Sequence, residues 1–76
     1  MKVYIQYEPD RCADVVNDET GEVLRSVYAP WAFVIHARAV VQPAERLLDA
    51  AVNWAVRKHL VVERVEVFDP EVEAIR

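Results

Sequence analysis

The chain has 76 residues, which suits one small domain. Its 13 acidic and 9 basic side chains give a formal charge of −4, which disfavours a general nucleic-acid coat and a polybasic membrane anchor. The hydrophobic share of 54% and the single glycine argue against an intrinsically disordered chain, so we expect one folded domain over residues 1–76.

A domain of this size has a small core and usually needs additional support. A disulfide bond within the chain is excluded because Cys12 is the only cysteine, and a zinc site is disfavoured because the two histidines, His36 and His59, lie far apart in the sequence. We therefore expect no cofactor. Stability should come from a very apolar core, from self-association, or from both.

Two features of the sequence bear on its location. Residues Met1–Tyr7 alternate as a strand does, without the basic start and apolar stretch of a secretory leader. The most apolar run, Ala29–Val41, is about 13 residues long and contains His36 and Arg38, whereas a bilayer-spanning helix needs about 20 apolar residues. The sequence predicts a cytoplasmic protein without a membrane helix.

The first half of the chain predicts three strands. Residues Lys2–Glu8 alternate between apolar and polar side chains, which is typical of a half-buried strand. Residues Cys12–Asn17 and Glu22–Tyr28 indicate a hairpin, in which Gly21 supplies the positive φ angle that the connecting turn requires. Both faces of this hairpin carry mixed side chains, so we expect it near a sheet edge.

Residues Phe33–Val41 alternate again and predict a long fourth strand. A helix over Trp31–Val41 is the alternative, because this segment is rich in alanine. After it, Pro43 and Glu45 suit the first turn of a helix that we expect over Pro43–His59. Its core-facing stripe consists of Ala44, Leu47, Leu48, Ala51, Trp54 and Ala55.

Residues Val61–Asp69 predict a last strand that Pro70 ends. The element order is then four strands, a helix and a strand. This order belongs to the α+β class, and we expect a mainly antiparallel sheet of four to five strands with the helix packed on one face. Because a single helix covers one face only, we expect the other face to be apolar and in need of a partner.

Three carboxylates stand at the ends of predicted elements: Glu8, Glu45 and Asp69. Their placement after the first strand, in the first helical turn and after the last strand is similar to the way ribonuclease H-like folds gather metal ligands. That resemblance implies a metal-dependent phosphodiesterase, although Tyr7-Glu8-Pro9 replaces the Asp-Gly-Ser type context of the family. The family also includes reduced, non-catalytic relatives that serve as antitoxins and interaction modules.

No other enzyme motif occurs in the sequence, and we assign no catalytic, cofactor-binding or metal-binding residue. Cys12 and His36 are the residue types of a nucleophile and its base, but nothing in the sequence brings them together. Their predicted roles are structural.

Charge is distributed unevenly along the chain. Residues 23–62 contain five basic and two acidic side chains, whereas residues 8–22 contain one basic and six acidic side chains. On the predicted helix, Arg46, Asn53 and Arg57 form a narrow basic stripe. This stripe raises nucleic-acid binding as a possibility that we rank last. The opposite charges of the two segments favour protein association.

The small size, the apolar excess and the absence of catalytic motifs predict a protein-interaction module of the inhibitor, adaptor or antitoxin type, possible in a virus or mobile element. We expect it to act as a homodimer and to bind a protein, with nucleic acid an unlikely partner and no membrane contact. The alternative is a minimal metal-dependent phosphodiesterase with a degenerate ribonuclease H-like set of carboxylates. The predicted contact residues, on the open sheet face or the flank of the helix, are Tyr4, Val34, His36, Arg38, Val40, Val52, Val56 and Phe68.

Overall fold

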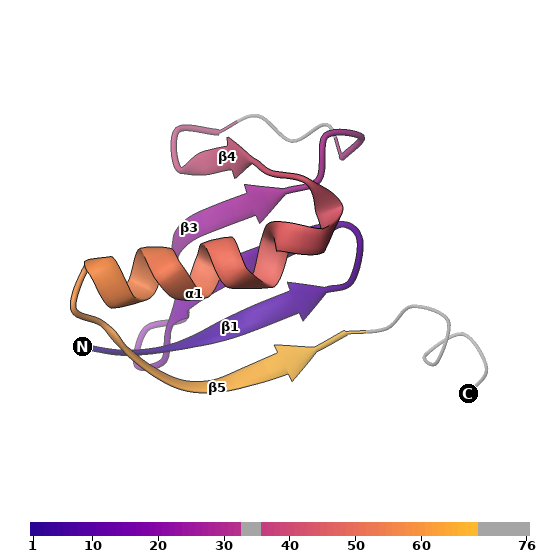
Figure 1. Cartoon of the computed structure of the whole chain (residues 1–76). Helices are drawn as coiled ribbons and strands as arrows, with labels where there is room; N and C mark the ends of the chain where they lie inside the picture. Colours follow the sequence, from indigo (N-terminus) through magenta and orange to yellow (C-terminus); the bar gives the residue numbers. More distant parts are fainter. Residues whose placement is uncertain (33–35, 69–76) are drawn as a thin grey trace.

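A computed structural model describes residues 1–32 and 36–68 (Figure 1). They form an α+β fold with five strands, one α-helix and a short 3₁₀ turn before it. The elements in chain order are β1 (Lys2–Glu8), β2 (Cys12–Asn17), β3 (Val23–Tyr28), β4 (Ala39–Val41), η1 (Ala44–Arg46), α1 (Leu47–Arg57) and β5 (Val61–Val67).

The five strands form one sheet in the order β4-β3-β2-β1-β5. Strand β2 is antiparallel to both of its neighbours, whereas β5 is parallel to β1 and β4 is parallel to β3. The sheet is therefore mixed, and the prediction of a mainly antiparallel sheet is wrong in this respect. The cause is the helix, which carries the chain from one edge of the sheet to the other, so that β5 returns beside β1 in the same direction.

The predicted first strand and hairpin are confirmed. Strand β1 has the predicted bounds, and β2 and β3 are joined by a turn in which Gly21 has a φ angle of 76°. The Asn17 carboxamide oxygen holds this turn by accepting the backbone N–H of Glu19 at 2.9 Å. Its backbone oxygen accepts the N–H of Gly21 at 2.8 Å. Asparagine favours turns because its side chain forms such local hydrogen bonds.

The long strand predicted over Phe33–Val41 is shorter in the structure. Among the described residues of this segment, only Ala39–Val41 pairs with β3, and the residues just before it form a turn. The N–H of Ala39 donates to the His36 carbonyl at 3.0 Å, and the N–H of Arg38 donates to His36 Nδ1 at 3.2 Å. These bonds replace strand pairing. Residues 33–35, including Val34, lie outside the described residues.

The predicted helix over Pro43–His59 corresponds to η1 and α1 together. Pro43 immediately precedes η1, and α1 ends at Arg57. The chain then turns sharply, because His59 has a φ angle of 60° and the N–H of Leu60 donates back to the Ala55 carbonyl at 2.9 Å. No helix among residues 1–32 and 36–68 is long and apolar enough to cross a bilayer.

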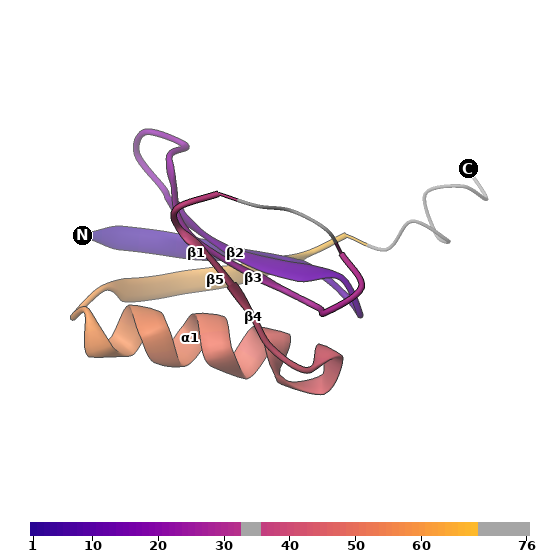
Figure 2. The same cartoon turned by 90° about the horizontal axis from the view of Figure 1, so that it is seen from above.

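The core lies between α1 and one face of the sheet (Figure 2). The helix contributes Leu47, Ala51 and Ala55, which are all fully buried. Two of these three are alanines, which let the helix approach the sheet closely. The buried sheet and loop residues against which they pack are Val3, Ile5, Ala13, Val15, Val27 and Ala29.

The sheet face opposite α1 carries both polar and apolar side chains, so it is not the uniformly apolar face that we expected. Tyr4 pairs with Val16, and Cys12 pairs with Tyr28, whereas the positions between these pairs are polar. Residues that lie opposite each other on paired strands share a face. Register pairs Gln6 with both Asp14 and Glu66, and Asp14 with Ser26. Two valines that we expected on this open face lie on the helix side instead. Val40 pairs with Val27 and Val62 pairs with Val3, and both Val27 and Val3 are core residues.

Candidate functional site

Three predicted contact residues of the open face are engaged within the chain. The Arg64 guanidinium lies 4.4 Å from the centre of the Tyr4 ring. Arg38 pairs with Glu22 at 2.8 Å, and the same nitrogen donates to a backbone carbonyl of β3 at 2.9 Å. The His36 ring packs edge-on against Tyr28, with centroids 5.9 Å apart. The contacts of Arg38 and His36 hold the turn before β4 against β3, and the contact of Arg64 with Tyr4 joins β5 to β1.

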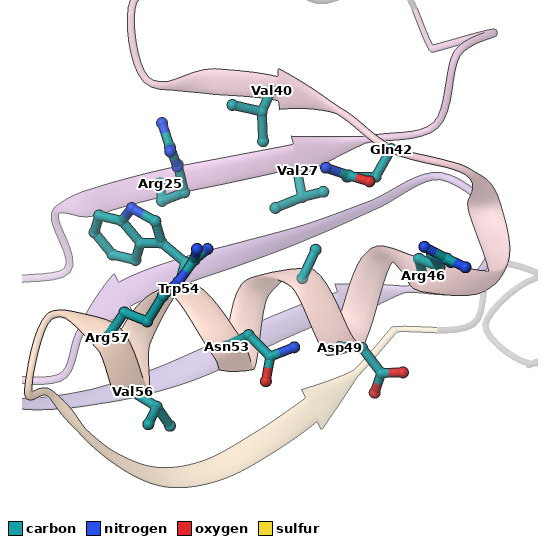
Figure 3. A pocket seen from close by; sticks show the side chains of 11 residues that line it. Arg25, Val27, Val40, Gln42, Arg46, Asp49, Asn53, Trp54, Val56 and Arg57 are labelled. Carbon is teal, nitrogen blue, oxygen red and sulfur yellow. The ribbon is translucent and has the colours of Figure 1, made fainter.

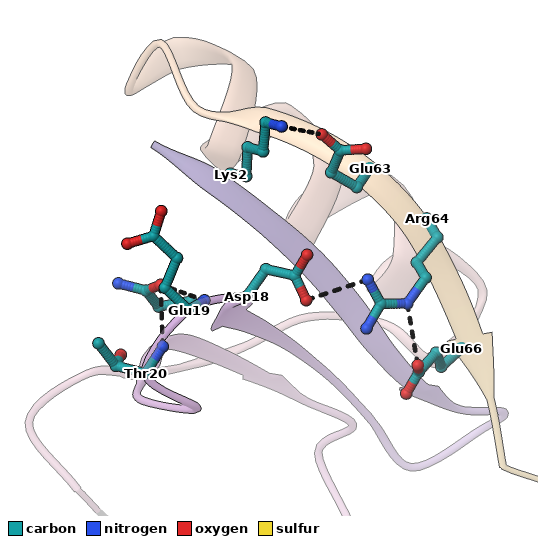
Figure 4. A network of polar contacts seen from close by, with 8 residues as sticks. Lys2, Asp18, Glu19, Thr20, Glu63, Arg64 and Glu66 are labelled. Carbon is teal, nitrogen blue, oxygen red and sulfur yellow. Dashed lines mark hydrogen bonds and ion pairs between the residues drawn. The ribbon is translucent and has the colours of Figure 1, made fainter.

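Arg64 is the centre of a polar network that connects β5 to the β2–β3 turn (Figure 4). Its Nε donates to Glu66 at 2.9 Å, and its Nη1 donates to Asp18 at 3.0 Å. A second pair, between Lys2 and Glu63, spans 3.6 Å across β1 and β5. Exposed pairs of this kind contribute about 1 kcal/mol or less each. Their main effect is to order the charged side chains of β5.

An apolar surface runs along the β5 side of α1, and we call it the β5 flank: Val52, Val56, Val65 and Val67. Val65 and Val67 pair with Ile5 and Tyr7, which places them on the helix side of the sheet. They are nevertheless 40% and 63% exposed. On the helix, Val52 is half-buried and Val56 is 60% exposed. Figure 3 shows Val56 pointing to the side of α1 along which β5 runs.

Among residues 1–32 and 36–68, strand β5 forms one open edge of the sheet and has seven residues, whereas the opposite edge strand, β4, has three. The N–H groups of Val61 and Phe68 donate to β1, to Met1 at 3.0 Å and to Tyr7 at 2.8 Å. Since backbone groups alternate in direction along a strand, those of Val65 and Val67 point outward. A long, valine-rich edge of this kind favours pairing with another strand.

A groove of about 780 Å³ lies on the other side of α1, between the helix and strands β3 and β4 (Figure 3). Its walls carry arginines from three elements: Arg25 of β3, Arg46 of η1 and Arg57 of α1. The Arg25 guanidinium lies 5.3 Å from the centre of the Trp54 ring. We call this site the arginine groove, and the other residues that line it are Val27, Val40, Gln42, Asp49, Ala50, Asn53, Trp54 and Val56.

The positive charge of the arginine groove is available to a ligand. Within residues 1–32 and 36–68, none of its three guanidinium groups forms an ion pair with a carboxylate. Asp49 is the single acidic residue that lines the groove. The sequence indicated Arg46, Asn53 and Arg57 through their helical spacing. It did not indicate Arg25, because the fold brings that residue in from a separate strand.

The three predicted metal-ligating carboxylates are not brought together in the described part of the chain. Glu8, at the end of β1, lies 3.7 Å from the Arg11 guanidinium, and Glu45 is exposed in η1. Asp69 lies outside the described residues. Among residues 1–32 and 36–68, no three His, Cys, Asp or Glu side chains lie close enough to hold a metal ion. A metal-dependent phosphodiesterase stays a hypothesis that no contact described here favours.

Cys12 lies beside acidic groups on the open face of the sheet. Burial and the negative charges of Asp14 and Glu8 raise the pKa of the Cys12 thiol to about 11. Its Sγ lies 3.9 Å from Glu8 Oε2, to which the thiol donates. Burial also raises the pKa of Asp14. The thiolate is the nucleophilic form of cysteine, and a raised pKa keeps the thiol protonated. This environment therefore favours a structural role for Cys12.

Cys12 should react slowly with iodoacetamide at pH 8. A pKa of about 11 instead of the ordinary 9.0 reduces the thiolate fraction by about 100-fold. The higher nucleophilicity of a more basic thiolate recovers roughly tenfold of this, which leaves a rate about tenfold below that of an accessible cysteine. The same protein unfolded in guanidinium chloride is the control. Equal rates for folded and unfolded chains would contradict the raised pKa.

Comparisons of the chain with protein-family models, curated proteins and solved structures found no match. The structure offers two candidate binding surfaces, the β5 flank and the arginine groove. They share Val56 and otherwise lie on different sides of α1, because Trp54 and Ala50 face the groove whereas helical spacing places Val52 on the side of β5.

Proposed function

We propose that the chain is a small cytoplasmic protein-interaction module of the inhibitor, adaptor or antitoxin type, and that it works as a homodimer. The observation that carries the proposal is the β5 edge, a seven-residue strand with open backbone groups and exposed valines beside the exposed Val56 of α1. The occupant of this edge is a second copy of β5. A lone, unpaired cysteine accords with a reducing compartment.

The side chains of β5 favour one register for two antiparallel copies. Centred on Val65, the pairing places Val65 opposite itself and Arg64 opposite Glu66 of the other copy. Opposite charges that face each other across strands are stabilising, and like charges are destabilising. A register centred on Arg64 would place two guanidinium groups opposite each other. The charge pattern therefore selects the register centred on Val65.

This register also suits the open backbone groups and the β5 flank. Val65 directs its N–H and C=O groups outward, so antiparallel pairing with Val65 of the other copy satisfies them. The two-fold axis is perpendicular to the sheet, which keeps both α1 helices on the same face. The flanks of the two copies then form one apolar surface between the helices. A continuous sheet through two edges also removes the exposed edge.

Reversal of either of two charges on β5, at Arg64 or at Glu66, tests this pairing. Arg64→Glu and Glu66→Arg should each weaken the dimer about tenfold or more, because each places like charges opposite each other twice. An equimolar mixture of the two variants should form a heterodimer with nearly the affinity of the unmodified chain, measured by sedimentation equilibrium. Within each variant chain, residues 64 and 66 carry charges of the same sign. Recovery in the mixture must therefore come from attraction between residues of the two different chains.

The matched control is the exposed pair of Arg38 and Glu22, which lies on the opposite half of the sheet. Arg38→Glu and Glu22→Arg should leave the dimer affinity unchanged, alone or mixed. Far-UV circular dichroism checks that every variant is folded. A monomer across the micromolar range for the unmodified chain, or a mixture that does not recover, would refute the proposed dimer.

A further inference from the structure

The arginine groove combines positive walls with an apolar floor. Arg25, Arg46 and Arg57 come from three different elements and form no ion pair with a described carboxylate. Between them lie Val27 and Val40, from paired positions of β3 and β4. A guanidinium group binds a carboxylate through two parallel hydrogen bonds. The groove is therefore suited to a ligand with both acidic and apolar groups.

The dimensions of the groove fit a short extended peptide. Arg46 precedes and Arg57 ends the helix α1, whose eleven residues extend over about 16 Å at 1.5 Å per residue. An extended peptide rises about 3.3 Å per residue, so about five residues cover the same length. Alternate side chains of such a peptide point to opposite sides. Acidic side chains at every second position can then face the arginines while the others face the floor.

We infer that the arginine groove binds an extended acidic peptide segment of a protein partner, in which acidic and apolar residues alternate. The inference rests on the proposed function, because it names the chemistry of the partner that the interaction module would recognise. Apart from Val56, which belongs to both surfaces, the groove and the β5 flank lie on different sides of α1, so a dimer can hold two such segments.

The charge of the whole chain favours a peptide over nucleic acid as the ligand. A formal charge of −4 opposes the long phosphate backbone of a nucleic acid, whose binding depends on many basic contacts. Three arginines suffice for a peptide that carries two or three carboxylates. The Arg25 guanidinium already lies against the ring of the half-buried Trp54, which leaves this ring less open to stacking with a nucleic-acid base. Trp54 more readily offers an apolar contact to a bound side chain.

Fluorescence of Trp54 provides a direct readout of binding. Trp31 is 59% exposed and does not line the groove, so Trp31→Phe leaves Trp54 as the single tryptophan. The probe is the capped pentapeptide ELELE, compared with its uncharged counterpart QLQLQ. The acidic peptide should bind at least tenfold more tightly, and its affinity should fall as salt increases. Isothermal titration calorimetry repeats the measurement without the fluorophore.

Two variants of equal charge locate the site. Arg57→Gln should reduce the affinity for ELELE at least fivefold, whereas Lys58→Gln should change it less than twofold, because Lys58 follows the helix and does not line the groove. Equal effects of the two variants would overturn the inference. So would the absence of a fluorescence change and of heat, or tighter binding of the oligonucleotide dT5, which would reassign the groove to nucleic acid.

The two proposals fail separately. A chain that carries Arg64→Glu is expected to dimerise at least tenfold more weakly and should still bind ELELE with unchanged affinity. If the unmodified chain is a monomer but binds the peptide through Arg57, the groove stands and the dimer falls. If the dimer forms and neither peptide nor oligonucleotide binds, the groove inference falls and the dimer stands.

Discussion

Leu47→Ala is expected to leave most of the protein unfolded at 25 °C. Leu47 is the first residue of α1, is fully buried and is one of the largest side chains in the core. Removal of a buried leucine side chain costs about 2–5 kcal/mol, because the remaining atoms fill the cavity only in part. A single core in a chain below roughly 70–80 residues seldom supplies more than about 3–5 kcal/mol. Urea unfolding followed by circular dichroism measures the loss.

The adjacent Leu48 provides a matched control. It has the same side chain and the same helix propensity, but it is only half-buried. Leu48→Ala should therefore cost less than half as much as Leu47→Ala. All chains are compared at one protein concentration, because dimer formation adds to the apparent stability. Coincident unfolding midpoints for the two variants would show that Leu47 does not have the central position that the structure gives it.

The elements with strong local signals were predicted well. Alternation over Lys2–Glu8, and a hairpin turn with a single glycine at the position of positive φ, are decided by neighbouring residues. The predicted helix begins one residue before η1 and ends two residues after α1, because Pro43 and the turn at His59 limit this helical segment. Such features depend on short stretches of chain that the sequence displays directly.

The features that were predicted wrongly depend on the whole fold. Alternation over Phe33–Val41 does not distinguish a strand from a turn that precedes one, and the structure has a turn at 36–38. Periodicity also carries no information on strand direction, so it did not indicate that β5 is parallel to β1. The same limit explains why valines were predicted on the wrong face of the sheet. Val40 and Val62 lie on the helix side because of their register with Val27 and Val3.

The candidate surfaces were predicted in part. Helical spacing placed Val52 and Val56 outside the core stripe. In the structure Val56 is exposed on the β5 side of α1, whereas Val52 is half-buried and packs against the core. Val65 belonged to an alternating strand, but the sequence could not show that this strand is an edge. Trp54 was assigned to the core stripe, and its position against Arg25 in the groove depends on the packing of α1 over β3.

Val65→Asp is expected to weaken the homodimer at least 100-fold. In the proposed register Val65 faces its own copy, so the variant places two carboxylates opposite each other in a contact that otherwise excludes water. Neither carboxylate gains a cationic partner, and burial of an unpaired charge is costly. The monomer should stay folded, because Val65 is 40% exposed. Sedimentation equilibrium gives the dimer affinity, and circular dichroism gives the fold.

Val41→Asp is the matched control for this change. Val41 lies on β4, the edge strand at the other side of the sheet, and is 63% exposed. The substitution adds the same charge to the other edge of the sheet, so it should alter the dimer affinity less than threefold. If Val41→Asp disrupts the dimer and Val65→Asp does not, self-association uses the β4 edge. That result would reject the pairing of two β5 strands that the exposed valines and the charges of this strand favour.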